Sequence, residues 1–261
     1  MLCVVDVVMG VTQLHDVVYI VCDNVMSSTI SRFSATTHQR LTDIVVKDLR
    51  DPRDIVACER TSKVYVADSE ECIWRVSSDG EDIKRWLPKS PSDTLKPWTL
   101  SVTSTRLLVT SYRTRQLIQF DEDGDELRRV QLPDDMIPKH AVESPTGTFI
   151  VSHVNKQLRQ DQVSEVNTTD SEVLRQFSGS HLLSLGVTPH VAVDSHGNVL
   201  VADFDSRRIL LLDAQLTLRR VIVDRHQLNY KQPLCLCYKE QSGQLLVGLR
   251  GDVAVFDVVC Q

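Results

Sequence analysis

Short apolar runs that each end on a small or polar residue recur along the whole chain. The run VLVAD, which ends at Asp203, has similar runs in YIVCD, VYVAD, LLVTS, FIVSH and LLVGL, which end at Asp23, Asp68, Ser111, His153 and Leu249. The ends of successive runs lie 42 to 50 residues apart, close to the roughly 40 to 50 residues of one β-propeller blade and too far apart for leucine-rich repeats. The pattern therefore predicts six copies of one structural unit.

Within a unit, the apolar positions favour four short strands. In the clearest copy we expect them at 190–194, 198–203, 208–213 and 218–223, and in the second copy at 53–58, 63–68, 72–77 and 82–87. Turn-forming residues separate these segments, as in the hairpin turn Ser78-Asp79-Gly80, where glycine permits a positive φ. No segment keeps a helical period of 3.6 residues, so the helix content should be low.

Proline marks the same position in the repeat. Five of the nine prolines stand just ahead of the strand that precedes each run, namely Pro52, Pro97, Pro138, Pro189 and Pro233. Proline has a fixed φ and no N–H, so it fits the entrance of a strand without breaking a ladder of hydrogen bonds. Because the runs and the prolines keep the same register, we predict an all-β fold, a six-bladed β-propeller of four-stranded antiparallel blades.

The same register gives the boundaries. We expect a single domain over 1–261, with blades at 9–50, 51–95, 96–136, 137–187 and 188–231, and a last blade made of 232–261 together with 1–8. The last unit ends after three strands, so we expect the N-terminal segment to supply its fourth strand and to close the ring.

The clearest unit resembles an NHL repeat, whose pattern has a proline ahead of A-V-D, then G-N-hydrophobic-V-A-D and then R-I. Here those positions are Pro189, Ala192-Val193-Asp194, Gly197-Asn198, Val201-Ala202-Asp203 and Arg208-Ile209. The second unit keeps Val66-Ala67-Asp68 and Cys72-Ile73-Trp74, and the other units match in topology alone.

The resemblance implies a propeller that presents a surface to protein or RNA partners, as in ubiquitin ligases of the TRIM-NHL type. One more distant branch is a peptidyl-amidoglycolate lyase with a metal in its central channel. The sequence has no RING, B-box or coiled-coil segment, so it does not support a ligase activity of its own. We expect a monomeric propeller, either complete or as the C-terminal part of a longer multidomain chain.

The strand entrances, together with the loops between second and third strands, should lie on one face of the disc. That face would mix aromatic and basic side chains, as binding hot spots do, and its candidate residues are Arg53, Trp98, Tyr112, Arg113, Lys139, His140, His190, Phe204, Asp205 and Arg207. The leading prediction is a non-catalytic scaffold that binds a protein or peptide ligand there without a cofactor. A loop face that is only solvated is the alternative.

Histidines suggest a different chemistry. If His140, His153 and His190 converged on the axis, their imidazoles would form a zinc site for a metal-dependent lyase or hydrolase. Asp68 and Asp203 are expected to cap turns instead, and the resemblance implies that Asp203 pairs with an arginine such as Arg208. The chain has no G-x-S-x-G, Walker or H-E-x-x-H motif, so the sequence favours a protein that is not an enzyme.

Composition narrows the partners and the compartment. A net charge of −6 argues against a nucleic acid partner, although Arg128-Arg129 and Arg219-Arg220 keep RNA binding as a further alternative. No segment reads as a signal peptide or spans a membrane by length and hydropathy. Seven cysteines without metal-binding spacing favour the cytoplasm. An extracellular location is the alternative, in which the sequon at Asn167 would matter.

Overall fold

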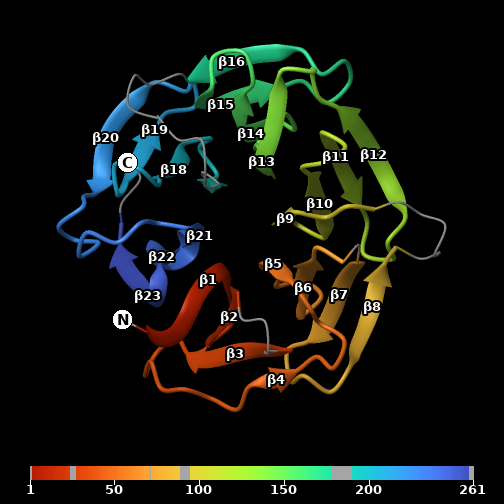
Figure 1. The fold of residues 1–261 in the computed structure, drawn as a ribbon, viewed down its shortest axis with the longest axis vertical. Helices are drawn as coiled ribbons and strands as arrows, with labels where there is room; N and C mark the ends of the chain where they lie inside the picture. The colour runs from red at the N-terminus through yellow and green to blue at the C-terminus, as the bar shows by residue number, and fades with distance from the viewer. Residues whose placement is uncertain (1, 24–27, 71, 89–94, 178–189, 259–261) are drawn as a thin grey trace.

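The computed structural model of the chain describes residues 2–23, 28–70, 72–88, 95–177 and 190–258. The repeat proline Pro189 and the expected boundary between the fourth and fifth units lie outside these residues. The strands form twisted antiparallel sheets around a central axis (Figure 1). The fold is therefore all-β, with four-stranded antiparallel blades in a propeller arrangement, as the sequence predicts.

Four of the sheets in the described part of the chain have four strands each. The first contains β5 (Pro52–Cys58), β6 (Lys63–Asp68), β7 (Cys72–Ser77) and β8 (Ile83–Leu87). The second contains β9 (Thr99–Thr103), β10 (Arg106–Ser111), β11 (Gln116–Phe120) and β12 (Glu126–Gln131). The third contains β13 (Met136–Glu143), β14 (Phe149–Asn155), β15 (Gln160–Val166) and β16 (Val173–Phe177). The fourth contains β17 (Val191–Val193), β18 (Val199–Asp203), β19 (Arg208–Leu212) and β20 (Leu218–Val223).

The remaining sheet has seven strands in the order β21-β22-β23-β1-β2-β3-β4. Its elements are β1 (Leu2–Leu14), β2 (Val17–Asp23), β3 (Thr29–Ser34), β4 (Ile44–Val45), β21 (Cys235–Lys239), the short 3-10 helix η1 (Glu240–Ser242), β22 (Gln244–Gly248) and β23 (Arg250–Asp257). The start of β1 pairs with β23, through Leu2 opposite Val253, and its later part pairs with β2. The two ends of the described chain are thus held together in one ladder.

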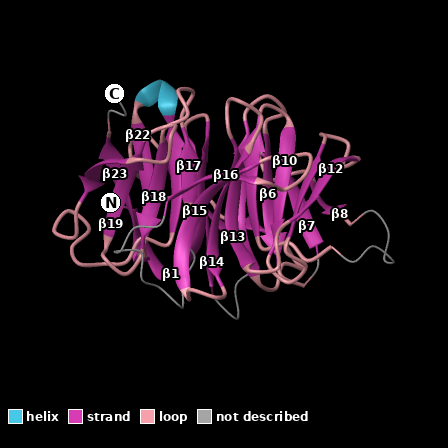
Figure 2. Ribbon diagram, turned by 90° about the horizontal axis from the view of Figure 1, so that it is seen from above, coloured by secondary structure: helices cyan, strands magenta, loops and turns pink. Residues whose placement is uncertain are grey.

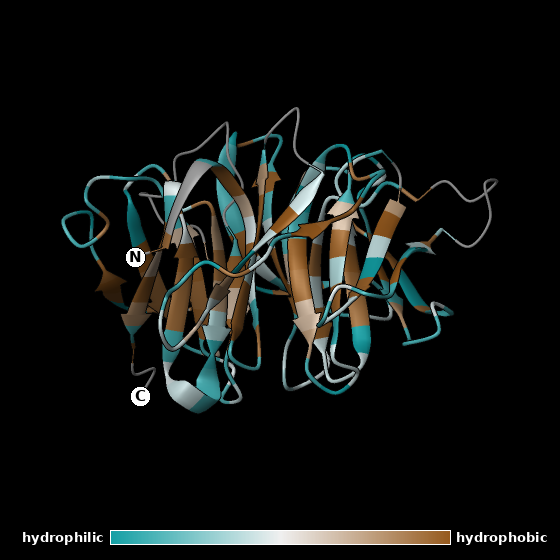
Figure 3. Cartoon of the chain, turned by 90° about the horizontal axis from the view of Figure 1, so that it is seen from below, coloured by the Kyte–Doolittle hydropathy of each residue, from teal (hydrophilic) through white to brown (hydrophobic). Residues whose placement is uncertain are grey.

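Apolar side chains fill the spaces between neighbouring sheets. Both faces of a blade contact another blade, so the second strands are buried almost throughout, as in β18. Figure 3 shows hydrophobic colour along the strands and hydrophilic colour at the turns. Between the β5–β8 and β9–β12 sheets, the ring of Trp86 packs on Tyr65 at a centroid distance of 4.9 Å and on Phe120 at 6.3 Å.

Antiparallel pairing gives the disc two distinct faces, which are seen from the side in Figure 2. The innermost strands begin on the face that carries Pro52, Pro97 and Pro138, called here the proline face. They end on the opposite face, called the channel face, where η1 lies (Figure 2). The turns between second and third strands return to the proline face, and those between third and fourth strands lie on the channel face.

Helix is nearly absent from the described residues, as the sequence predicts, and η1 is its single example there. None of the described helical residues makes a segment long and apolar enough to cross a membrane.

Candidate functional site

Four side chains from three sheets form a continuous row on the proline face, called here the aromatic–basic row. The guanidinium carbon of Arg53 lies 5.0 Å from the ring centroid of Trp98, and the centroids of Trp98 and Tyr112 are 5.4 Å apart. The ammonium of Lys139 lies 4.8 Å from the Tyr112 centroid. A cation over an aromatic face is attractive, by about 0.5 to 1 kcal/mol at exposed sites. Trp98 is half-buried and Tyr112 is 37% exposed, so the row is accessible to a partner.

Two β-bulges place the basic ends of this row. The register between β5 and β6 shifts between Pro52 and Asp54, and the register between β13 and β14 shifts between Pro138 and His140. Each shift leaves one extra residue outside the ladder, which re-aims its side chain. Arg53 and Lys139 are those residues, while the residues that follow them, Asp54 and His140, are buried near the axis.

The other residues predicted for this face take different positions. Arg113, Asp205 and Arg207 are exposed on turns after β10 and β18, and Phe204 is half-buried beside them. His140 and His190 do not lie on the exposed face, because they are 1% and 6% exposed. His140 lies on β13 and His190 just ahead of β17, and both line the cavity along the axis.

His140 and His190 stack on each other, with ring centroids 3.6 Å apart and an interplanar angle of 28°. His140 Nε2 donates to the carbonyl of Leu100 at 3.1 Å, and its Nδ1 accepts from the Val191 N–H at 3.4 Å. His190 Nδ1 accepts from the Leu236 N–H at 3.3 Å. These bonds place the proton of both neutral rings on Nε2. The pair thereby joins β13 to β9, β17 and β21.

Other polar side chains of the innermost strands make similar contacts between sheets. Asp54 Oδ2 accepts from the Leu100 N–H at 2.8 Å, and Thr12 Oγ1 accepts from the Ala57 N–H at 3.1 Å. Thr99 Oγ1 donates to the Lys139 carbonyl at 2.7 Å. Buried backbone groups that no ladder pairs need a partner. These side chains supply it, so their first role is to hold neighbouring blades together.

The predicted zinc site can be tested against this geometry. Ligand atoms of Asp54, His140 and His190 lie within 4.8 Å of one another. His153 is not in this group, and its Nε2 lies 2.9 Å from Ser164 Oγ in the adjacent strand of its own sheet. Both nitrogens of His140 are already hydrogen-bonded to backbone groups. The lone pairs of a ring nitrogen lie in the plane of the ring, so two stacked rings do not direct them toward one metal ion. The residues do not fit a tetrahedral zinc ion, and we derive no function through a metal.

Beside the aromatic–basic row lies a buried carboxyl group, Asp161 on β15, which is 4% exposed. Burial raises its pKa to about 7, nearby Lys139 partly offsets that rise, and the charges of Asp205 and Asp203 add to it. Burial also lowers the pKa of Lys139, and Asp161 opposes that change. The row is therefore coupled to a group that titrates near neutral pH.

Stability should depend on pH in two opposing ways. Burial lowers the pKa of His153 to about 4 and that of His140 well below its usual value. The unfolded chain then binds more protons than the folded one, so stability that is present above pH ~6.5 is lost as the pH falls. For His153 the loss between pH 7 and 5 is about 2 kcal/mol. Asp161 has a raised pKa, so its charge destabilises the fold increasingly as the pH rises from about 4 to 7.

Asp161→Asn should therefore increase stability at pH 7 to 8 and make the acid-induced loss steeper than in the native protein. Urea unfolding at pH 5, 6, 7 and 8 measures both effects. Asp161→Asn combined with His153→Asn should flatten the profile again. A single variant that keeps the native pH profile would show that Asp161 is not the opposing group.

Sequence reasoning missed Asp54 and Asp161. Asp54 stands two residues after Pro52, as His140 stands two residues after Pro138, and this shared offset is a signal that could have found it. No comparable signal exists for Asp161, because only the packing of β15 brings it near Lys139.

A cavity of about 630 Å³ follows the axis and is lined by all the innermost strands, β1, β5, β9, β13, β17 and β21. Its lining runs from His140 and His190 out to Glu59, Ser104, Pro145, Ser195 and Glu240, at the turns into the second strands. The cavity therefore opens on the channel face, on the opposite side of the disc from the aromatic–basic row.

Comparisons with known proteins support the fold. No family model and no curated protein matches the chain. One similar solved structure is virginiamycin B lyase from Staphylococcus aureus, in a catalytically inactive histidine-to-alanine variant with quinupristin. Its TM-score is 0.66 at 14% sequence identity, and the match covers 95% of this chain and 78% of that chain. Hydrazine synthase from Kuenenia stuttgartiensis has a TM-score of 0.68 at 14% identity, over 97% of this chain and 84% of its own. A chain of a nidogen–laminin complex has a TM-score of 0.67 at 15% identity, over 98% of this chain and 87% of its own. These neighbours are β-propellers, and they include both a lyase and a member of a protein complex.

Proposed function

We propose that the protein is a non-catalytic scaffold that binds a protein or peptide ligand on the proline face. The observation that carries this proposal is the aromatic–basic row, in which Trp98 and Tyr112 stand between Arg53 and Lys139. Tryptophan, tyrosine and arginine are the residues most enriched in binding hot spots. Their mutual contacts hold the side chains in place before a partner arrives, which reduces the entropy lost on binding.

The charge of the proline face favours an acidic ligand. Arg113, Lys156 and Arg207 are exposed on its turns, and Arg50 is exposed beside the entrance of β5. Among the described residues of this face, exposed bases outnumber exposed acids, although the whole chain has a net charge of −6. A partner segment that carries Asp or Glu would meet a complementary field there.

The hydrogen bonds of His140 and His190 favour a structural role for this pair over a catalytic one. Three of the four ring nitrogens of His140 and His190 are hydrogen-bonded to backbone, which gives the pair a structural role. Among the described residues, Asp54, His140 and His190 lie close together but do not fit a zinc ion, so a metal-dependent lyase is less well supported. An RNA-binding propeller is less well supported because the chain has a net charge of −6.

The proposal takes the chain as a six-bladed propeller of the NHL type, in the cytoplasm. In this interpretation the seven-stranded sheet is two blades that share β1. The first residues of β1 are the outermost strand of the blade formed by β21, β22 and β23, and its later residues are the innermost strand of the blade that contains β2, β3 and β4. The pairing of Leu2 with Val253 and of Leu14 with Val17 supports this division.

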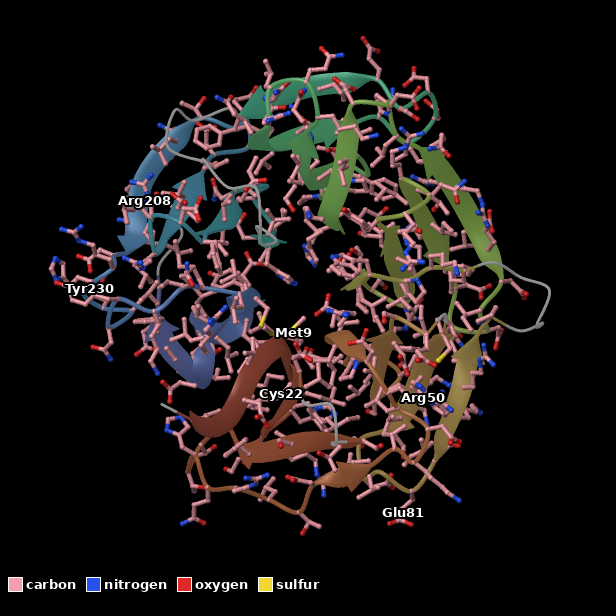
Figure 4. All side chains as sticks on the ribbon, viewed as in Figure 1. Met9, Cys22, Arg50, Glu81, Arg208 and Tyr230 are labelled. Carbon is pink, nitrogen blue, oxygen red and sulfur yellow. The ribbon has the colours of Figure 1, made fainter. Side chains whose placement is uncertain are left out.

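The test is to select peptides from a displayed library on the immobilised protein and to measure the affinity of the recovered peptides for variants. Trp98→Ala and Tyr112→Ala should each weaken binding at least tenfold, as the loss of a hot-spot aromatic does, and should leave the melting temperature nearly unchanged. Tyr230→Ala is the matched control, because Tyr230 is 56% exposed and lies at the outer edge of the disc (Figure 4).

Two results would overturn the proposal. If Trp98→Ala and Tyr112→Ala lower the free energy of unfolding as much as they lower the binding free energy, the aromatic–basic row is part of the core. The site lies elsewhere if the selected peptides bind Trp98→Ala and Tyr112→Ala as tightly as the native protein.

A further inference from the structure

The two faces of the disc differ in charge. On the channel face, the turns between third and fourth strands carry dense acidic sequences at 79–82 and 121–126. On the proline face, Arg113, Lys156 and Arg207 are exposed on the turns between second and third strands. None of these three side chains makes an ion pair among the described residues. A negatively charged ligand is therefore attracted to the proline face.

The aromatic–basic row on that face is not symmetric in charge. At one end, Arg53 Nη2 lies 2.6 Å from Asp51 Oδ2, so a carboxylate already compensates the charge of the guanidinium. At the other end, the ammonium of Lys139 lies 4.8 Å from the centroid of the Tyr112 ring and makes no ion pair among the described residues. The uncompensated charge of the row is therefore at its Lys139 end.

Asp161 does not compensate this charge in full. It makes no ion pair with Lys139, and burial raises its pKa to about 7, an effect that Lys139 partly offsets. A carboxyl group with that pKa is about half protonated at neutral pH. Burial also lowers the pKa of Lys139. An anion of the ligand beside the ammonium would favour the charged form of Lys139.

The accessible surface next to Lys139 is aromatic. Trp98 is half-buried and Tyr112 is 37% exposed, and Arg113 directly follows Tyr112 in the chain. A ring of the ligand can pack against these two aromatic side chains. The ligand that matches both features has an aromatic ring with an anionic group attached directly to it, because the aromatic and cationic groups of the protein are adjacent.

A phosphate monoester matches the charge better than a carboxylate. At neutral pH it carries close to two negative charges and three strong acceptor oxygens, whereas the side chain of Asp or Glu carries one charge. Lys139 and Arg113 together supply two cations without an ion pair among the described residues. Charge-assisted hydrogen bonds from both would hold the phosphate.

We propose that the proline face binds a phosphotyrosine side chain of a partner protein, with its ring against Trp98 and Tyr112 and its phosphate beside Lys139 and Arg113. The phosphotyrosine site rests on the proposed function, because it names the kind of residue that the ligand surface recognises. A strand of nucleic acid also offers rings and phosphates, but the net charge of −6 opposes the many phosphates of such a strand.

Calorimetric titration of the full chain with four short peptides tests the proposal. The peptides carry phosphotyrosine, tyrosine, phosphoserine or glutamate between alanines. The phosphotyrosine peptide should bind about tenfold more tightly than the tyrosine peptide, which lacks the charge. It should also bind about fivefold more tightly than the phosphoserine and glutamate peptides, which lack the ring.

Variants then locate the binding. Lys139→Met should weaken binding of the phosphotyrosine peptide about tenfold and leave the tyrosine peptide unchanged, because it removes the charge and keeps an apolar side chain. Trp98→Ala should weaken the phosphotyrosine peptide and leave the phosphoserine peptide unchanged. Arg113→Gln serves if Lys139→Met does not fold, because Arg113 is exposed. Arg60→Met is the matched control, because Arg60 is an exposed cation on the channel face without an ion pair among the described residues.

The proposal is overturned if the phosphotyrosine peptide binds no more tightly than the tyrosine peptide. It is also overturned if the phosphoserine peptide binds as tightly, or if Arg60→Met weakens binding as much as Lys139→Met, since charge alone would then be responsible. A single-stranded oligothymidine that binds more tightly than the phosphotyrosine peptide, and that loses affinity in Trp98→Ala, would overturn it in favour of nucleic acid. Library peptides without phosphate that bind the row while the phosphotyrosine peptide does not would overturn this inference and leave the proposed function intact.

Discussion

Deletion of residues 1–8 should destabilise the whole propeller and reduce its solubility. Leu2 and Val8 are 1% and 0% exposed, and they pack in one cluster with Leu246 and Val253. Removal of two fully buried side chains costs about 4 kcal/mol, at about 2 kcal/mol each, before the lost strand pairing is counted. For a domain of this size, the melting temperature should fall by at least about 10 °C.

The deletion also exposes the edge of β23, whose backbone groups would be free to pair with another chain. Thermal unfolding and sedimentation of the truncated protein measure the two effects. Leu127→Ser is the control, because Leu127 is 52% exposed on β12 and its replacement should be nearly neutral. An unchanged melting curve after truncation would show that the start of β1 does not stabilise β23.

Gly10→Ala should cost about 2 to 4 kcal/mol of stability. A Cβ at Gly10 would lie 2.6 Å from the backbone nitrogen of Ile55 and 2.9 Å from Asp54 Oδ1. Relief of that contact requires β5 to move away from β1, and the movement would strain the hydrogen bond from the Leu100 N–H to Asp54. Urea unfolding gives the free energy directly.

Gly147→Ala is the control, because it tests the cost of the backbone conformation without a steric contact. Nothing lies within 4 Å of a Cβ at Gly147, but its φ is +81°, so alanine there should cost about 1 kcal/mol for conformation alone. If Gly10→Ala costs no more than this control, the close approach of β1 and β5 does not require glycine.

Much of the fold was predictable from the sequence because one pattern repeats. The predicted strands at 63–68 and 72–77 coincide with β6 and β7, and the predicted strand at 218–223 coincides with β20. In these segments the local apolar pattern and the turn-forming residues indicate the same strand boundaries, so one sequence without relatives is enough to predict them.

The bulges and the contacts between blades were not predictable in this way. The extra residue in a bulge, Arg53 or Lys139, cannot be recognised from the apolar pattern. It nevertheless determines which side chain reaches the surface and which adjacent side chain is buried. This is why the sequence predicts His140 at an exposed face, whereas the structure has it stacked on His190. The acidic turns are visible in the sequence, but their position on one face follows only from the antiparallel strand order.

The separation of basic and acidic residues between the two faces gives the disc an electric dipole along its axis. Such a molecule is rotated by the field of a charged partner before any contact forms, within roughly one Debye length of about 8 Å at physiological salt. An acidic partner would meet the aromatic–basic row first, and a cationic one would meet the mouth of the cavity. Two copies would attract each other head to tail along the axis, most strongly when salt is low.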